Sequence, residues 1–241
     1  MNIEKEELIT KKRLLESAQL AYQKDIVLYT DFLGLAEQNL FYTSLREFPP
    51  VTYSCYGGVA GAERFCIAFD GREGVSGITM TEPEEYYLFP IVCVSITPSS
   101  LKYSETLTHR DYLGALLHLG ITRAKLGDIY IKEKGAFVFC TEAIAEFICK
   151  ELCTVKHTLV HCEITIPEAE LLQPELKEIT STVASLRLDA FLSVAFQSSR
   201  TSLTAYIDGE KTFVNGRLAT KAGLQLNEGD IVSVRGKGRF Q

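Results

Sequence analysis

Apolar residues recur at helical intervals in the first part of the chain. Between Ile3 and about Phe48 they return on the spacing of the buried face of an amphipathic helix. The pair Pro49-Pro50 interrupts the pattern, because proline lacks the amide hydrogen that continues a helix. We therefore predict a helical N-terminal region over residues 1–50.

Residues 51–166 show an ordered alternation of strand and helix patterns. The pattern predicts a short strand at 64–70, a buried strand at 87–96, a helix at 108–119, strands at 128–132 and 135–140, a helix at 141–152 and a strand at 157–166. From residue 87 the order is strand–helix–strand–strand–helix–strand, which is the split βαβ plan that RNA-recognition motifs (RRMs) also use. The sequence thus predicts an RRM-like/ferredoxin-like central domain at 51–166 and an α+β fold class.

Capping signals define the first helix of this domain. Thr108 is a good N-cap, and Asp111 follows three residues later, as in a capping box. Gly120 then ends the helix. His109-Arg110-Asp111 is also the tripeptide of a kinase catalytic loop, but the chain lacks the other kinase motifs. Asp111 is therefore interpreted as a helix-start residue that the helix dipole favours.

Two phenylalanines stand in the third strand of the predicted RRM-like plan. The run Lys134-Gly-Ala-Phe137-Val-Phe139 is similar to the third-strand signature of RRMs. On an open sheet face, Phe137 and Phe139 could stack RNA bases. They could equally be core residues, and the sequence alone favours burial of at least one of them.

The end of the chain predicts a smaller module of two short helices and a small sheet. The first helix is expected at 187–196, and Ser199 is a good N-cap for a second helix at 200–207. Gly209 is expected to end that helix with a positive φ. Asn215-Gly216 predicts a hairpin turn, and a final strand is expected at 231–234.

Charge is distributed unevenly along the chain. The whole chain carries a formal charge of −6, whereas residues 181–241 contain eight Lys or Arg and five Asp or Glu and so carry +3. The remaining residues therefore carry −9, which suggests that the C-terminal end faces a polyanion. Residues 167–183 are acidic and polar and are predicted to be a linker before a module at 184–241.

The C-terminal module resembles the S4 domain, a small RNA-binding module. The matching stretches are Arg187-Leu-Asp-Ala-Phe-Leu, Ser199-Arg200-Thr201, Ile207-Asp-Gly209, Val214-Asn-Gly-Arg217 and Glu228-Gly-Asp-Ile-Val-Ser-Val-Arg235-Gly-Lys-Gly-Arg239-Phe. Arg200 begins the second helix, where backbone N–H groups also point outward, so a phosphate contact is expected there. The resemblance implies an S4 (αL-type) RNA-binding domain with contacts from Arg187, Ser199, Arg200, Thr201, Lys211, Arg217, Lys221, Arg235, Lys237 and Arg239.

Stretches in the middle of the chain resemble the YlmH-type family of bacterial S4-domain proteins. They are Gly57-Gly58, Gly61-Ala-Glu-Arg64, Leu107-Thr-His-Arg-Asp-Tyr-Leu-Gly114 and Leu119-Gly-Ile-Thr-Arg123-Ala-Lys-Leu-Gly-Asp-Ile129. The resemblance implies an RNA-binding protein of the large ribosomal subunit that acts in rescue of stalled translation (ribosome-associated quality control). It also implies a second RNA surface at His109, Arg110 and Arg123.

The expected partners are rRNA, tRNA, the large ribosomal subunit and other quality-control factors. The protein is expected to be cytoplasmic and not inserted in a membrane, because the sequence shows neither a signal peptide nor an apolar run long enough to span a membrane. It is also expected to be a monomer. The seven cysteines are then mostly buried thiols in a reducing compartment. Two alternatives stay open: an S4-domain RNA-modifying enzyme or accessory, and an interaction protein of the cell-division machinery.

No catalytic motif, cofactor or metal site is predicted. Cys149, Cys153, His157 and His161 recur every four residues, as zinc ligands on a helix could, but the predicted strand at 157–166 would make them diverge. Asp189 is expected to pair with a neighbouring arginine or to cap a turn. An essential Asp occurs in pseudouridine synthases that carry an S4 domain, but their catalytic domain is larger than the segment available here.

Arg200→Glu should weaken RNA binding strongly without unfolding the protein, because it inverts the charge of a surface residue in the predicted phosphate contact. RNA binding and thermal melting of the variant test this expectation. Unchanged binding would remove Arg200 from the site.

Overall fold

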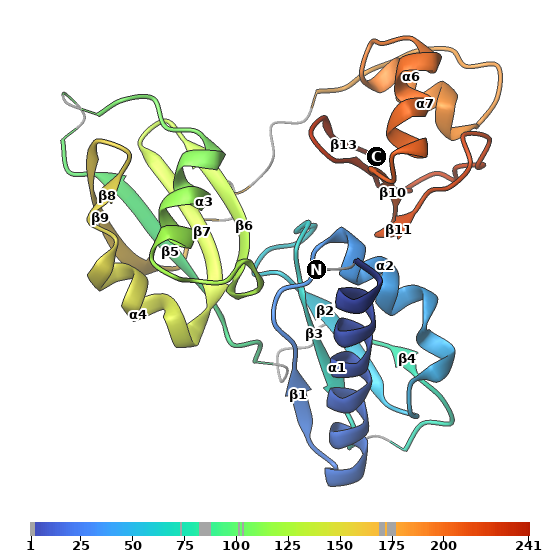
Figure 1. The fold of residues 1–241 in the computed structure, drawn as a ribbon, viewed down its shortest axis with the longest axis horizontal. Helices are drawn as coiled ribbons and strands as arrows, with labels where there is room; N and C mark the ends of the chain where they lie inside the picture. The colour runs from blue at the N-terminus through green and yellow to red at the C-terminus, as the bar shows by residue number, and fades with distance from the viewer. Residues whose placement is uncertain are drawn as a thin grey trace. The chain divides into compact units, whose positions relative to one another are not determined.

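The structure, a computed structural model, describes residues 3–72, 74–81, 88–100, 102, 104–168, 172 and 177–241, without the side chains of residues 3–6 and 200. The chain divides into two compact units. The first is Met1–Gly34 with Leu45–Gln173, and the second is Leu35–Ser44 with Pro174–Gln241. Figure 1 shows the elements of each unit, and the α+β fold class is confirmed.

The N-terminal part of the first unit is a four-stranded sheet with a long helix. The elements are α1 (Ile3–Lys24), β1 (Val27–Tyr29), the 3-10 helix η1 (Leu45–Glu47), β2 (Thr52–Tyr56), β3 (Cys66–Asp70) and β4 (Thr79–Met80), with strand order β1-β3-β2-β4. Leu14, Ala18 and Ala21 of α1 are buried. A Cβ on Gly71 would collide with the backbone of Ala21, so α1 passes very close to the end of β3.

This region differs from the helical region predicted over residues 1–50. Asp25, with φ of 51°, follows the end of α1, and Val27–Tyr29 then pairs with the distant strand β3, in the register Val27 to Asp70. A short apolar run of this kind cannot be assigned to helix or strand from periodicity alone. The predicted RRM-like domain at 51–166 included residues 52–80. Strands β2, β3 and β4 of that segment instead belong to the same sheet as β1, so this part of the prediction is wrong.

The RRM-like sheet itself is confirmed. Its elements are β5 (Ile91–Pro98), α3 (His109–His118), the 3-10 helix η3 (Arg123–Lys125), β6 (Leu126–Lys132), β7 (Gly135–Thr141), α4 (Glu142–Glu151), β8 (Thr154–Val155) and β9 (Thr158–Thr165). The antiparallel order β6-β7-β5-β9-β8 is the ferredoxin-like order with one short strand added at the β9 edge. Tyr87, the predicted start of the first strand, lies outside the described residues, as do 169–171 and 173–176 of the predicted linker.

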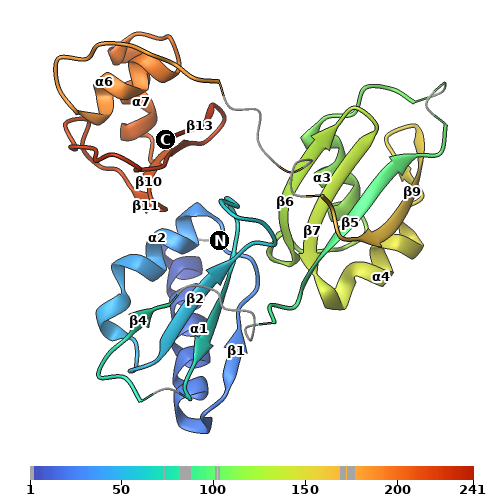
Figure 2. The ribbon, with the colours of Figure 1, turned by 180° about the vertical axis from the view of Figure 1, so that it is seen from behind.

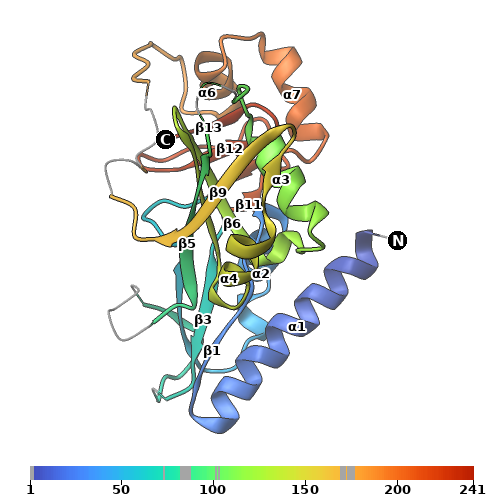
Figure 3. The same ribbon diagram turned by 90° about the vertical axis from the view of Figure 1, so that its left-hand side faces the viewer.

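The two faces of this sheet bury different clusters. Helices α3 and α4 cover one face (Figure 3), where Val94, Ile96, Val138, Leu116 and Ile148 are fully buried. Figure 2 shows strands β6, β7, β5 and β9 side by side from behind. On that second face Phe139 packs with Phe32, Cys66, Cys93 and Leu172. The sheet is therefore packed on both faces around β7.

The second unit contains a C-terminal module in the predicted form. Its elements are α6 (Leu188–Ala195), α7 (Arg200–Asp208), β10 (Thr212–Val214), β11 (Arg217–Leu218), β12 (Val232–Val234) and β13 (Gly238–Phe240), with strand order β11-β10-β12-β13. Ser199 Oγ accepts a 3.2 Å hydrogen bond from the Ser202 amide, which confirms the N-cap. Asn215 and Gly216 both have positive φ, as a type I′ hairpin turn needs. Strand β13 was not predicted.

Helix α2 (Leu35–Thr43) belongs to the second unit although it precedes most of the first in sequence. The Leu218 amide of β11 donates a 2.8 Å hydrogen bond to Asn39 Oδ1. An edge-strand amide that would otherwise face solvent is thereby satisfied.

The predicted positive φ of Gly209 is wrong. Gly209 has φ of −86°, and the left-handed residue is the next one, Glu210, with φ of 54°. The helix thus ends one residue later than the glycine signal indicated. A Cβ at residue 209 would still come within 2.9 Å of the Ala205 carbonyl oxygen.

The thiols follow the predicted pattern. Four of the seven cysteines are buried, at positions 66, 93, 140 and 162, and Cys153 is exposed. Burial raises the pKa of these four thiols to about 12, so they stay protonated at neutral pH. No helix of the described residues is long and apolar enough to span a bilayer.

Gly58→Ala should destabilise the first unit by roughly 2–4 kcal/mol, because overpacking and a left-handed backbone both penalise a Cβ. Gly58 has φ of +96°, and a Cβ there would collide with the Phe139 ring. Denaturant unfolding measures the loss. Gly114→Ala is the control, since its Cβ would meet nothing within 4 Å in α3 and should stabilise by about 0.5–1 kcal/mol. Equal stability of both variants would contradict the close packing at Phe139.

Candidate nucleic-acid interface

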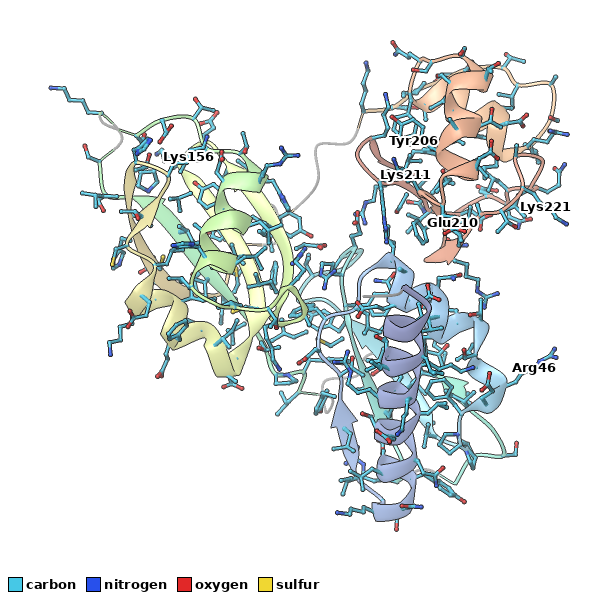
Figure 4. All side chains as sticks on the ribbon, viewed as in Figure 1. Arg46, Lys156, Tyr206, Glu210, Lys211 and Lys221 are labelled. Carbon is cyan, nitrogen blue, oxygen red and sulfur yellow. The ribbon has the colours of Figure 1, made fainter. Side chains whose placement is uncertain are left out.

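Two lysines of the C-terminal module converge on one aromatic ring. Lys211 follows α7 and Lys237 lies in the β12–β13 turn, and their Nζ atoms are 5.9 and 5.8 Å from the ring centroid of Tyr206. Figure 4 labels Tyr206 and Lys211. The backbone holds this arrangement, because the Lys211 amide donates to the Tyr206 carbonyl at 2.8 Å. The sequence placed Lys211 and Lys237 in the site but missed Tyr206. The residues after Tyr206 include Asp208 and Glu210 as well as Lys211, so no basic run in the sequence marked this ring.

Arg235 joins the same end of the module. Its guanidinium lies over the ring of Phe213 at 5.1 Å, and its amide donates to the Lys211 carbonyl at 2.9 Å. Phe213 is buried, whereas Arg235 is exposed. We call Tyr206, Lys211, Arg235 and Lys237 the Tyr206 cluster. Asp208, the last residue of α7, and Glu210 in the connection that follows are exposed acids, so the local charge is not purely positive.

Other predicted contacts of the module are committed to structural partners. Arg187 forms a two-pronged ion pair with Asp189 at 3.1 and 3.2 Å, which raises the pKa of Arg187 and confirms the expected pairing of Asp189. Arg217 lies over the ring of Tyr42 in α2 at 5.6 Å. Ser199 Oγ is the N-cap of α7.

The remaining predicted residues of the module are Arg200, Thr201, Lys221 and Arg239. Thr201, Lys221 and Arg239 are exposed. Arg200 begins α7, but its side chain lies outside the described part of the structure. Its contact with phosphate stays a prediction.

In the central domain, the positively charged side chain of Arg123 also forms hydrogen bonds with the backbone. Its Nη1 donates to the carbonyls of Leu126 at 2.8 Å and Gly127 at 3.0 Å. Burial, followed by the nearby Arg64 cation, lowers the pKa of Arg123 to about 10, so it is still charged at neutral pH. This guanidinium fixes the turn into β6.

His109 and Arg110 are exposed at the start of α3. The pKa of His109 is lowered, first by partial desolvation of its ring and then by the Arg123 cation, which favours the neutral imidazole. Arg110 lines an open groove of about 480 Å³ with His118 and Lys156 (Figure 4 labels Lys156). Asp111 and Glu151 line the same groove, so it has mixed charge.

Arg64, the last residue of the motif Gly61-Ala-Glu-Arg64, connects its own segment to the segments of Phe32 and of residues 123–126 in the first unit. Its guanidinium donates to the carbonyls of Phe32 at 3.0 Å, Leu126 at 3.0 Å and Arg123 at 3.3 Å. The Asp128 carboxylate accepts from the amides of Glu63 at 2.6 Å and Arg64 at 3.2 Å. The motif residues of this region therefore hold the fold together.

The sheet face that RRMs use for stacking is closed at Phe139. Phe139 is 3% exposed, and its ring meets Tyr130 edge-on at 6.0 Å. This confirms that at least one of the two phenylalanines is core. Phe137 is half-buried at the same face.

The Cys and His residues considered as zinc ligands are spread over α4, β9 and the connections between them. Cys149 is on α4, Cys153 follows its end, and His161 is on β9. Within the described ranges, no three His, Cys, Asp or Glu side chains gather to hold a metal ion.

Comparison with known proteins confirms the resemblance to the YlmH-type family. Residues 89–168 match the family described as a putative RNA-binding domain in YlmH. A Bacillus subtilis (strain 168) protein named ribosome-associated protein quality control protein P2 is 26% identical over 238 residues, covering 93% of this chain and 84% of its own length. The solved structure titled cell division protein ylmH from Streptococcus pneumoniae has a TM-score of 0.50 and 20% identity, covering 68% of this chain and 93% of that one, and supports the fold.

The pKa of Asp111 gives a pH test of its role as a cap. Hydrogen bonds from the Thr108 hydroxyl at 2.7 Å, Lys156 at 2.9 Å and the Thr108 amide at 2.8 Å lower the pKa of Asp111 from 3.8 to about 2. Because the folded-state pKa is depressed, the stabilisation is present above the unfolded pKa and is lost as pH falls through about 2.

We therefore expect Asp111→Asn to lower the melting temperature at neutral pH and to flatten the loss of stability below pH about 4. A carbon-13 titration of the carboxyl group gives the midpoint directly. Lys156→Gln should move that midpoint upward. A wild-type midpoint at the ordinary value would exclude the capping role.

Proposed function

We propose that this chain, whose central segment matches the YlmH RNA-binding domain, binds rRNA and tRNA on the large ribosomal subunit and acts in ribosome-associated quality control. An RNA-binding, ribosome-associated role is supported by the matched domain and by the name of the Bacillus subtilis relative. The protein acts by binding rather than by catalysis, as a cytoplasmic monomer.

The observation that carries the proposal is the convergence of Lys211, Arg235 and Lys237 at one end of the C-terminal module. In the S4-type interpretation, these exposed cations contact phosphates and fix the orientation of the protein on structured RNA. Residues 1–180 carry a net negative charge, which disfavours nonspecific binding of RNA by the rest of the chain. Affinity then comes from a small number of phosphate contacts.

The central domain contributes in a different way from an RRM. Its sheet face is closed at Phe139, so base stacking there would require unpacking of the core. His109 and Arg110 remain exposed on the α3 side and are available to a second RNA or ribosomal surface. Arg123 supports this surface by holding the turn before β6.

Lys211→Glu with Lys237→Glu should abolish co-migration with large ribosomal subunits in a lysate gradient at moderate salt, because it replaces two attractive charges with repulsive ones. Binding of the wild type should fall by roughly 0.7–0.9 log units per log unit of salt for each phosphate neutralised. Lys12→Glu with Lys134→Glu is the matched control, with the same charge change at exposed positions of the first unit. Wild-type protein that stays at the top of the gradient would refute the proposal.

A further inference from the structure

We infer that the Tyr206 cluster recognises an unpaired nucleotide: its base stacks on the Tyr206 ring, and its flanking phosphates are held by Lys211 and Lys237. The inference rests on the proposed function, because it names the kind of RNA element that the C-terminal module takes. Three features of the cluster carry it: the position of the ring, the freedom of the lysines and the geometry of paired bases.

The ring of Tyr206 lies at the margin of the module rather than in its core. Its neighbours Leu203 and Ile207 on α7 are 1% and 3% exposed and point into the core, whereas Tyr206 is half-buried and packs on the outside of the same cluster. The Nζ atoms of the exposed Lys211 and Lys237 lie close to this ring. Ammonium groups over a ring at the surface are hydrated and are easily displaced by a base.

The lysines are free to bind phosphate. Among the described residues, no ion pair involves Lys211 or Lys237, in contrast to Arg187, which is paired with Asp189. Their positions are nevertheless fixed at the backbone, since the Lys211 amide binds the Tyr206 carbonyl and the Lys237 amide donates to the Val234 carbonyl at 3.0 Å. Two unpaired cations are thus held next to a ring, and only their side chains must move.

A paired base cannot use such a ring. In a duplex each base face is covered by its neighbours, so a protein reaches only the grooves and the phosphates. Bases in loops, bulges and single strands expose their faces and stack on aromatic side chains, with cations on the adjoining backbone. Because every base has a π-face, stacking on Tyr206 would tolerate different sequences.

The rest of the molecule supports this location. The sheet of the central domain buries Phe139, so stacking on its third strand is blocked there. The ring of Phe213 is buried beneath Arg235, and the ring of Tyr42 lies beneath Arg217. Tyr206, by contrast, combines a half-buried ring with two cations that form no ion pair among the described residues.

The test uses the full chain and two RNAs of equal length and charge: a hairpin with an unpaired loop and a blunt duplex. Tyr206→Leu should weaken binding to the hairpin by about five- to a hundredfold, the range expected for losing one stacked base. Binding to the duplex should be unchanged. Tyr206→Phe keeps the ring and should bind the hairpin like the wild type.

A second readout does not depend on the variants folding well. With 2-aminopurine in the loop, saturating wild-type protein should change its fluorescence, whereas the same fluorophore in the duplex should not respond. Unchanged loop fluorescence at saturation, or equal losses for hairpin and duplex in Tyr206→Leu, would overturn the inference. A third outcome separates the two proposals. If Lys211→Glu with Lys237→Glu abolishes binding to both RNAs and Tyr206→Leu affects neither, the proposed function stands and stacking is refuted. No binding of either RNA by the wild type would refute both.

Discussion

The guanidinium of Arg64 is the interaction on which the first unit depends. The backbone carbonyl of Phe32 in one segment and those of Arg123 and Leu126 in another all accept hydrogen bonds from this one side chain. Buried carbonyls without donors would be costly, and a planar fork of five N–H groups is the side chain best suited to serve several at once. The Asp128 carboxylate on the amides of Glu63 and Arg64 fixes the same junction from the other side.

This junction decides how the central sheet can be used. With Phe32 held by Arg64, its ring packs beside Phe139 on the face that RRMs leave open. In this chain the RRM-like topology therefore does not leave Phe139 on that sheet face exposed for base stacking. Fold and function separate here because the same strands can bury either face, depending on what the chain packs against them.

Local signals in the sequence predicted most of the central domain and the C-terminal module. Thr108, Ser199 and Asn215-Gly216 act through their immediate neighbours, so their caps and turn could be predicted from the sequence. Strands β1 and β4 could not, because they have three and two residues and each is defined by a partner more than twenty residues away in the chain. The Tyr206 cluster was found only in part for the same reason, since Lys211 and Lys237 reach the ring from segments separated by most of the small sheet. The positive φ at Glu210 was missed because a glycine stands beside it.

Helix α2 has a consequence for the order in which the protein is made. The hydrogen bond between Asn39 and Leu218 joins residues 179 positions apart, so α2 leaves the ribosome long before its partner strand exists. Neither compact unit is a contiguous stretch of chain, and the second cannot be completed until synthesis is nearly finished. Contacts of such high sequence separation form slowly. The second unit can therefore be fully folded only when synthesis of the chain is nearly complete.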